Sequence, residues 1–170
     1  MAPDFEALIK ALTTHDVKSV IIGGLAMVVH GSTYITEDID IAYERDQHNI
    51  ERLVAALEPF HPRLRVRGEP NGLAFRFDVT TIKNGANFTL VTDVGNVDIL
   101  AHIDGYGSFK ELESDSERVE AFGYNIAVLS IDGLIRAKRA SARPKDLLAI
   151  PELEVLKEVH EQRSSTRPKQ

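Results

Sequence analysis

The sequence predicts a single α/β (α+β) domain, in which helices flank a mixed central β-sheet and a helical segment lies at the C-terminal end. Runs of Val and Ile alternate with amphipathic stretches in the N-terminal third, the pattern of strands that alternate with helices. The middle of the chain shows strand-like segments separated by Gly-containing turns, which predicts hairpins. Residues 130–160 return to helical spacing. The helices are therefore expected mainly at the two ends.

The composition is that of a globular domain. The chain has 170 residues, 43% hydrophobic and 27% charged, and no cysteine, which excludes disulfides and thiolate metal sites. Its formal charge of −6 argues against a general nucleic-acid coat. No apolar run approaches the ~20 residues that span a bilayer, and no secretory signal is evident. We expect a cytoplasmic protein without a membrane partner, with one domain at 1–160 and a disordered tail at 161–170.

The first half of the chain alternates helices and strands. Pro3 and Asp4 open a helix that runs to about His15, with its apolar residues on one face. The next expected elements are a buried strand at Val17–Ile22, a short helix at Gly24–His30, a strand at Asp38–Tyr43 and a helix at Asp46–Leu57 that stops near Pro59. Strand-like segments follow at Arg63–Arg67, Leu73–Val79 and Asn87–Thr92.

The second half predicts two hairpins and two helices. Turn sequences join Asn87–Thr92 to Asn96–Ala101, and Glu117–Ala121 to Tyr124–Leu129. Ser130 then caps a helix that runs to about Ala142, and Pro144 opens another that runs to roughly His160. The segment 134–145 carries five Lys and Arg residues, which suit either an anionic ligand or a solvated helix face.

Most of the candidate site residues lie between Val20 and Tyr43. Asp38 and Asp40 are two residues apart on a strand, so their side chains share one face and repel each other unless a cation lies between them. Mg²⁺ takes such oxygen ligands together with substrate phosphates. Gly23 and Gly24 stand at a helix start, where backbone N–H groups can bind phosphate. Thr36 could orient Asp38 or contact a phosphate.

Each of these signals alone has a simpler explanation. A pair of glycines after a strand is most often a tight turn, and an Asp-hydrophobic-Asp triplet most often marks an exposed strand. Asp98 lies on a later strand among Val, Ile and Leu, where it is either the polar side of a hairpin or a third site carboxylate. The order of strand, Gly-Gly, short helix and acidic pair favours the site, with Asp38, Asp40 and Asp98 as a triad.

Together these residues resemble the signature of the DNA polymerase beta-type nucleotidyltransferase superfamily. There a Gly-Gly or Gly-Ser motif precedes an Asp-hydrophobic-Asp pair and a third acid follows on a later strand. The sequence is most similar to small bacterial nucleotidyltransferase-like proteins related to the abortive-infection toxin group. The matching segments are Gly23-Gly24-Leu25-Ala26, His30-Gly31, Thr36-Glu37-Asp38-Ile39-Asp40 and residues 129–153.

The resemblance implies a fold, an activity and a site. It implies a mixed sheet of the nucleotidyltransferase type and Mg²⁺-dependent transfer of a nucleoside monophosphate from a nucleoside triphosphate (NTP), in a toxin-antitoxin or phage-defence context. Two Mg²⁺ ions would be held by Asp38, Asp40 and Asp98, with Asp98 also helping to deprotonate the acceptor hydroxyl. Gly23, Gly24, Thr36, Lys138 and Asp146 would contact nucleotide or phosphate. The acceptor stays open between tRNA or other RNA, a protein hydroxyl and a small molecule.

Two readings of the activity stay open. Relatives often carry an arginine about where this chain has Tyr34, and its loss would weaken triphosphate binding or change the substrate. The alternative function is a catalytically inactive protein of the same fold that acts as a nucleotide-binding or antitoxin-like partner. Arg63, Arg65 and Arg67 alternate along one strand, which fits either a cleft for a polyanion such as tRNA or an exposed edge strand kept soluble by charge.

Overall fold

The fold is known from a computed structural model, which describes residues 2–167. Its strands are β1 (Ser19–Ile22), β2 (Asp38–Tyr43), β3 (Arg63–Val66), β4 (Glu69–Leu73), β5 (Asn87–Thr92), β6 (Gly95–Leu100), β7 (Ser116–Ala121) and β8 (Tyr124–Leu129). Its helices are α1 (Phe5–Thr14), α2 (Gly23–Val29), α3 (Gln47–Leu57), α4 (Val79–Asn84), α5 (Phe109–Ser114), α6 (Ile131–Ser141) and α7 (Pro144–Ser165). A short 3₁₀ turn spans Glu58–Phe60.

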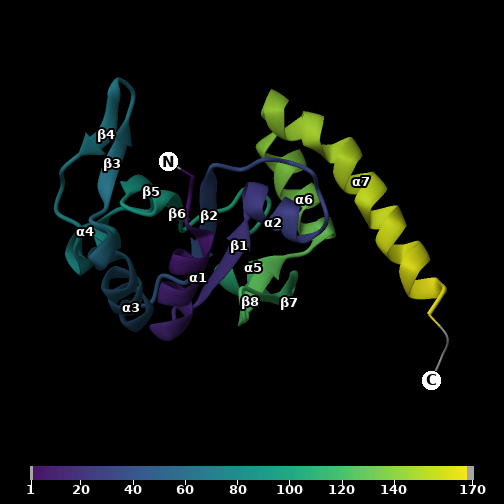
Figure 1. The fold of residues 1–170 in the computed structure, drawn as a ribbon, viewed down its shortest axis with the longest axis horizontal. Coiled ribbons are helices and arrows are strands. Elements are labelled where there is room, and N and C mark those ends of the chain that lie inside the picture. The colour runs from purple at the N-terminus through teal and green to yellow at the C-terminus, as the bar shows by residue number, and fades with distance from the viewer. Residues whose placement is uncertain (1, 168–170) are drawn as a thin grey trace.

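The strands form one mixed sheet in the order β4-β3-β5-β6-β2-β1-β8-β7, and helices flank it (Figure 1). The predicted fold class is therefore confirmed. β2 pairs antiparallel with β1 and parallel with β6, and β1 pairs parallel with β8. The two predicted hairpins are β5–β6 and β7–β8. The strand that carries the acidic pair thus lies near the centre of the sheet, next to the strand that carries Asp98.

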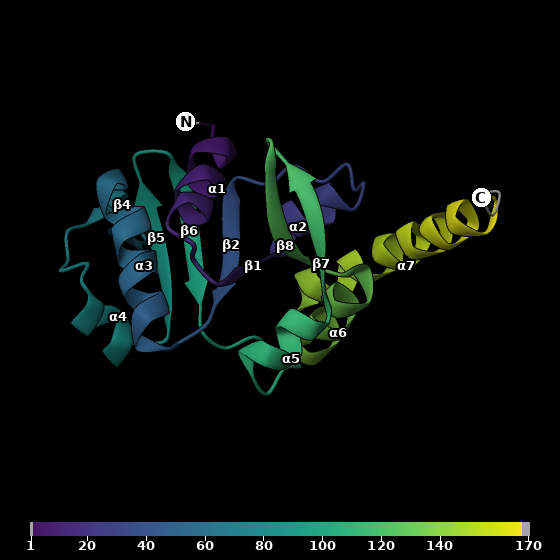
Figure 2. The same cartoon turned by 90° about the horizontal axis from the view of Figure 1, so that it is seen from below.

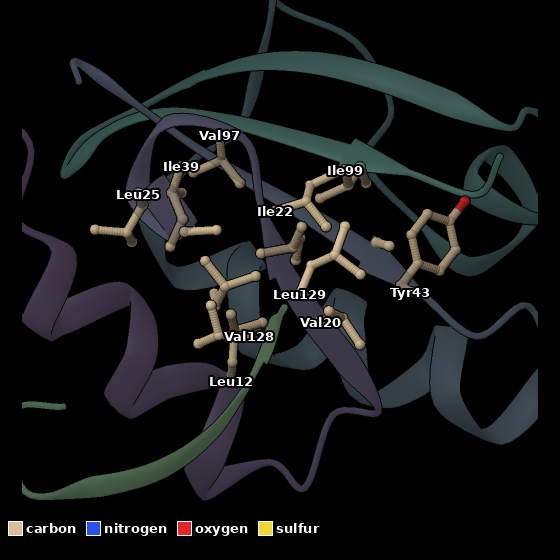
Figure 3. Close-up of a cluster of buried hydrophobic side chains, with 14 of the residues drawn as sticks. Leu12, Val20, Ile22, Leu25, Ile39, Tyr43, Val97, Ile99, Val128 and Leu129 are labelled. Atoms are coloured by element: carbon tan, nitrogen blue, oxygen red, sulfur yellow. The ribbon is translucent and has the colours of Figure 1, made fainter. Parts of the chain in front are cut away.

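The hydrophobic core lies against the central strands. Ile39 and Ile41 of β2 and Val97 and Ile99 of β6 are fully buried, and Figure 3 shows several of these side chains converging with those of β1 and β8. α1 and α3 pack side by side over the sheet (Figure 2). Because side chains alternate along a strand, burying this face directs the acidic residues of β2 and β6 to the other one.

Helix caps confirm several predicted boundaries. Asp4, Asp46 and Ser130 accept hydrogen bonds from the first-turn backbone N–H groups of α1, α3 and α6, respectively. Pro144 occupies the first turn of α7, where its missing N–H costs nothing. α7 continues through Ser165, beyond the end expected near His160, so part of the segment expected as a tail is helical. Residues 168–170 of that segment lie outside the described residues.

The strand expected at Leu73–Val79 is wrong. The hairpin partner of β3 is β4, joined to it by a tight turn in which Gly68 has φ +89°, and the other neighbour of β3 is β5. Asp78 then caps α4, because its carboxylate accepts a hydrogen bond from the backbone N–H of Thr81 at 2.8 Å. α4 and α5 were not anticipated from the apolar spacing, since each has only six residues. Of the helices in residues 2–167, none combines the length and apolar character that crossing a bilayer requires.

Candidate active site

The three predicted carboxylates come together on one face of the sheet. In the parallel pairing of β2 and β6, Asp40 stands opposite Asp98 and Asp38 stands opposite Asn96. Ile39, between the two acids of β2, points into the core and is fully buried. Asn96 adds a hydrogen bond from its Nδ2 to Asp38 Oδ1 at 3.3 Å. The register of two central strands therefore produces the cluster that the spacing predicted.

Burial and crowding make Asp40 and Asp98 difficult to ionise. Burial, followed by repulsion from Asp98 and Asp38, raises the pKa of Asp40 to about 6. The pKa of Asp98 is also raised, chiefly by burial, and a nearby guanidinium only partly offsets that effect. Carboxyl groups with pKa values raised toward neutrality are typical of sites that exchange protons or bind cations.

The guanidinium belongs to Arg65 of β3. Its Nη1 donates to Asp38 Oδ2 at 3.0 Å, and its Nη2 donates to Asp98 Oδ1 and Oδ2 at 2.6 and 2.8 Å. Burial alone would lower the pKa of Arg65, but the two carboxylates outweigh it and the pKa is raised. Arg65 is thus permanently charged, and it contacts two of the three acids.

Its two neighbours in the alternating arginine series do not share this role. Arg63 turns to the β5–β6 turn, where its Nη2 lies 3.3 Å from Asp93 Oδ1. Arg67 is exposed. The three arginines therefore do not form a continuous basic strip, and only Arg65 joins the acidic cluster.

The donor set suits a divalent cation, but the side chains do not surround one as they stand. Carboxylate oxygens are the ligands that Mg²⁺ prefers, and Asp38, Asp40 and Asp98 present them from one face. Within residues 2–167, however, no group of three or more His, Cys, Asp or Glu side chains is arranged to hold a metal ion. Instead, Arg65 donates hydrogen bonds to oxygens of both Asp38 and Asp98. The three carboxylates are thus suitable ligands for Mg²⁺, but in this structure Asp38 and Asp98 bind Arg65.

The two glycines have distinct structural roles. Gly23 has φ +64°, and a Cβ there would overlap the carboxylate of Asp40. A Cβ on Gly24 would lie 2.7 Å from Thr36 Oγ1 and 2.9 Å from the ring of Tyr34. The loop before β2 therefore packs directly on Gly24, and this contact is a reason for the glycine besides approach of a phosphate. Thr36 Oγ1 donates to the backbone carbonyl of Asp38 at 2.9 Å, which orients the start of β2.

Lys138 and Asp146 pair with each other where α6 meets α7. Lys138 Nζ lies 3.4 Å from Asp146 Oδ1, and Asp146 Oδ2 accepts from Ser141 Oγ at 2.8 Å and from Arg143 Nε at 2.6 Å. Burial would raise the pKa of Asp146, but these hydrogen bonds hold it below its ordinary value. The contacts join the two helices, and a phosphate role for either residue stays a prediction.

Lys145, the second residue of α7, is the cation of this segment that acts on the acidic cluster. Although burial dominates the pKa values of Asp40 and Asp98, Lys145 lowers both. In Figure 1 the β3–β4 hairpin and the α6–α7 pair stand on opposite sides of the central strands. Arg65 contacts Asp38 and Asp98 directly, and Lys145 acts on Asp40 and Asp98 through its charge. Sequence spacing named the five basic residues of 134–145 but could not choose Lys145 among them.

Residues 4–163 match the sequence family described as nucleotidyltransferase of unknown function (DUF6036). The chain belongs to this family. The matched range contains all the predicted site residues as well as Arg65 and Lys145. A comparison with curated proteins gives no significant match.

Several solved structures have a similar fold. They include a Thermotoga maritima protein, TM1012, described as a nucleotidyltransferase (TM-score 0.53, 16% identity, 93% of this chain and 91% of that one). The lincosamide antibiotic adenylyltransferase LnuA with bound lincomycin has TM-score 0.54 at 16% identity, over 91% and 98% of the two chains. ANT(2″)-Ia in complex with adenylyl-2″-tobramycin has TM-score 0.53 at 16% identity, over 94% and 96%.

At this identity the structural likeness concerns the fold, and the family match carries the assignment as a nucleotidyltransferase. The kinship with the polymerase beta superfamily and with the abortive-infection toxin group stays a prediction from the motifs. The roles of the individual site residues in this nucleotidyltransferase likewise remain predictions.

Proposed function

We propose that this nucleotidyltransferase transfers a nucleoside monophosphate from an NTP to a hydroxyl group of an acceptor, in a Mg²⁺-dependent reaction. The observation that carries the proposal is the parallel register of β2 and β6, which aligns Asp38, Asp40 and Asp98 on one face of the sheet. The family assignment supports the reaction class. Asp38, Asp40 and Asp98 would hold the ions, which would neutralise triphosphate charge and align the reacting oxygens.

The residues of the chain would supply positioning and proton transfer. The acceptor oxygen forms a bond to the α-phosphorus, the bond between that phosphorus and the bridging oxygen breaks, and pyrophosphate leaves. The hydroxyl proton passes to Asp98, whose pKa is raised by burial and so lies nearer the working pH than that of a free aspartate. Arg65 and Lys145 offer positive charge to the triphosphate from the two sides of the acidic cluster.

The acceptor is proposed from the ligands bound in solved structures of similar fold, not from a pocket of this protein. The solved complexes of similar fold contain lincomycin in one case and adenylylated tobramycin in the other, so a small hydroxylated molecule is the first acceptor to test. RNA, including tRNA, and protein hydroxyls complete the panel. A toxin-antitoxin or phage-defence role, which the sequence resemblance suggests, and a cytoplasmic location, which the composition suggests, are further parts of the proposal.

The test uses the full chain with each of the four NTPs, labelled at the α-phosphate, and Mg²⁺. The acceptors are aminoglycosides, lincosamides, total RNA and lysate protein, and the readout is label transfer. We expect transfer that requires Mg²⁺ and falls by about a hundredfold or more in Asp98→Asn, since loss of a general base costs roughly that much. The control is Asp104→Asn, an exposed aspartate outside the site. Transfer that is unaffected by Asp98→Asn would contradict the assignment.

Two observations favour the alternative, a nucleotide-binding protein without activity. Arg65 already pairs with Asp38 and Asp98, and Tyr34 packs on Gly24 where the motif predicts phosphate approach. For an inactive protein, thermal stabilisation by NTP would be independent of Mg²⁺ and no acceptor would be labelled. For the enzyme, Mg²⁺ and NTP together would stabilise the fold more than either alone.

A further inference from the structure

Arg65 occupies the carboxylate cluster in a way that bears on how the site is loaded. Its guanidinium makes three hydrogen bonds to two carboxylates, at 2.6 to 3.0 Å. The Arg65 side chain is 30% exposed, against 36% for Asp38 and 16% for Asp98. Charge-assisted contacts of this kind are strong when they are partly shielded from water. A divalent cation that binds Asp38 and Asp98 would compete with Arg65 for these oxygens.

The backbone places Arg65 where it can leave the cluster. β3 pairs with β5 only at Arg63 and Leu64, and its pairing with β4 shifts register between Leu64 and Val66. Arg65 therefore lies just past the last residue that joins the β3–β4 hairpin to the rest of the sheet. Because a bulged edge hairpin has few constraints beyond its own pairing, the arginine can change partners without disturbing β2 or β6.

The electrostatics supply a reason for this exchange. With Arg65 removed, the three partly buried carboxylates would face one another without the guanidinium that now pairs with two of them. A divalent cation would neutralise them better, but it would leave the guanidinium without a partner. A triphosphate would give the displaced guanidinium new oxygens to bind, in the bidentate manner that arginine favours.

We propose that Arg65 is an exchangeable counter-ion that occupies the carboxylate site in the absence of nucleotide and competes with the divalent cation for Asp38 and Asp98. When an NTP binds, Arg65 moves to its phosphates and the cation takes its place. Cation and nucleotide then bind cooperatively, because each removes the obstacle to the other. This inference rests on the proposed function, and specifically on the metal site.

The first experiment titrates the full-length protein with Mn²⁺ alone and measures free Mn²⁺ by electron paramagnetic resonance. We expect Arg65→Gln to bind Mn²⁺ at least about tenfold more tightly than the wild type, within the usual range of coupling effects. Arg65→Lys keeps the charge without the two-pronged geometry and is expected between the two. Arg67→Gln is the matched control, since it removes an exposed arginine from the same hairpin and is expected to match the wild type.

The second experiment separates exchange from a structural role. Thermal unfolding in EDTA is expected to show Arg65→Gln melting below the wild type, because the acids lose their counter-ion, and Mn²⁺ is expected to restore the melting temperature. Calorimetric binding of the α,β-methylene analogues of the four NTPs, with and without Mg²⁺, is expected to show a smaller Mg²⁺ effect in Arg65→Gln than in the wild type.

The outcomes distinguish this inference from the proposed function. If Arg65→Gln and Arg65→Lys bind Mn²⁺ as weakly as the wild type, while all three bind Mg²⁺ with nucleotide, the counter-ion role is overturned and the metal site stands. If no variant binds Mn²⁺ with or without nucleotide analogue, the metal site of the proposed function fails, and the exchange fails with it. A melting temperature that drops in Arg65→Gln and is not restored by Mn²⁺ would make Arg65 purely structural.

Discussion

At the scale of single residues, Asp40 carries the largest energetic cost in the acidic cluster. Its carboxyl lies between Asp38 on its own strand and Asp98 on the next, and against the backbone of Gly23. Burial and repulsion raise its pKa from 3.8 to about 6. Between these two pH values, Asp40 keeps its proton in the folded state and has lost it in the unfolded chain. Ionising Asp40 at neutral pH therefore costs folding free energy, a common cost of a functional site.

The sign of this effect gives a prediction for Asp40→Asn, which mimics the protonated group. Because the folded pKa is raised, the wild type loses stability as pH rises from about 4 to about 6, and the loss stays constant above. The variant avoids this loss. In EDTA, urea unfolding should give equal stabilities near pH 4 and a gain on the order of 2–3 kcal/mol for Asp40→Asn at pH 7, from 1.36 kcal/mol per pKa unit.

The same titration with Asp104→Asn serves as the control, since Asp104 is exposed and outside the cluster. Its stability should follow the wild type at every pH. A difference between Asp40→Asn and wild type that does not depend on pH would mean that Asp40 is not strained by its charge.

Sequence reasoning found the acids but left the roles of the cations open, for a physical reason. The two-residue period of a strand places Asp38 and Asp40 on one face before any fold is known. Arg65 meets Asp98 only because β3, β5, β6 and β2 are consecutive in the sheet. Strand order is set by the packing of the whole molecule, so local spacing left Arg65 ambiguous and could not choose Lys145.

At the scale of elements, the start of α2 depends on glycine for two separable reasons. Gly23 combines a left-handed backbone, φ +64°, with close approach to Asp40. Gly68, in the β3–β4 turn, has φ +89°, and among the described residues nothing would lie within 4 Å of an added Cβ. A comparison of substitutions at Gly23 and Gly68 therefore separates the effect of backbone strain from the effect of steric contact.

We predict that Gly68→Ala lowers the free energy of unfolding by about 1–2 kcal/mol, the cost of a left-handed non-glycine residue. Gly23→Ala should cost roughly 1–3 kcal/mol more, because its methyl group must displace the carboxylate of Asp40. Urea unfolding at pH 7 measures both. Equal losses in the two variants would show that Asp40 yields freely and that Gly23 is needed only for its φ angle.

The α6–α7 junction gives a second prediction at this scale. Asp146 is 6% exposed and binds Ser141, Arg143 and Lys138, so Asp146→Asn leaves a partly buried Lys138 without its partner. We expect a loss of about 3–5 kcal/mol at pH 7, the range for removing one partner of a buried ion pair. Because the pKa of Asp146 is lowered on folding, the difference should shrink as pH falls through that lowered value.

Nucleotide binding by this variant decides between the two roles of Asp146. If Asp146 only joins α6 to α7, then Asp146→Asn combined with stabilising substitutions elsewhere should recover both the fold and the nucleotide affinity. If Asp146→Asn keeps its stability and loses nucleotide affinity, the residue acts on phosphate, as the sequence resemblance implies.

Element prediction failed where two local signals competed. Leu73–Val79 reads L-A-F-R-F-D-V, whose aromatic alternation favours a strand. In the fold, Phe75 packs near both Phe77 and Phe88, and Asp78 caps α4. Asp78 begins α4, so the extended segment before it ends without pairing in the sheet. The strand that pairs with β3 is Glu69–Leu73, which follows the turn at Gly68. Caps and turn glycines were here more reliable than alternation.

At the scale of the whole molecule, the chain divides into a body and a projecting helix end. α7 leaves the body and carries the chain away from the sheet (Figure 2). Its anchoring contacts include the fully buried Leu153, the Ser32–Glu152 hydrogen bond at 2.6 Å, and His160 Nε2 at 3.0 Å from the carbonyl oxygen of His30. Residues 161–167 are exposed. We propose that residues 1–160 form one folding unit to which residues 161–170 contribute little.

This proposal predicts the effect of shortening the chain. A chain that ends at His160 should unfold within about 0.5 kcal/mol of the full chain, the scale of changes at exposed positions, because it keeps the anchoring contacts of α7. A chain that ends at Ala142 loses Asp146, Glu152 and Leu153, and should lose several kcal/mol or fail to fold, since burying Leu153 alone contributes about 2–5 kcal/mol. Urea unfolding followed by circular dichroism measures both. A loss above 1 kcal/mol in the His160 chain, with the Ala142 chain as the destabilised reference, would mean that the end of α7 contributes to the fold and that the unit extends beyond residue 160.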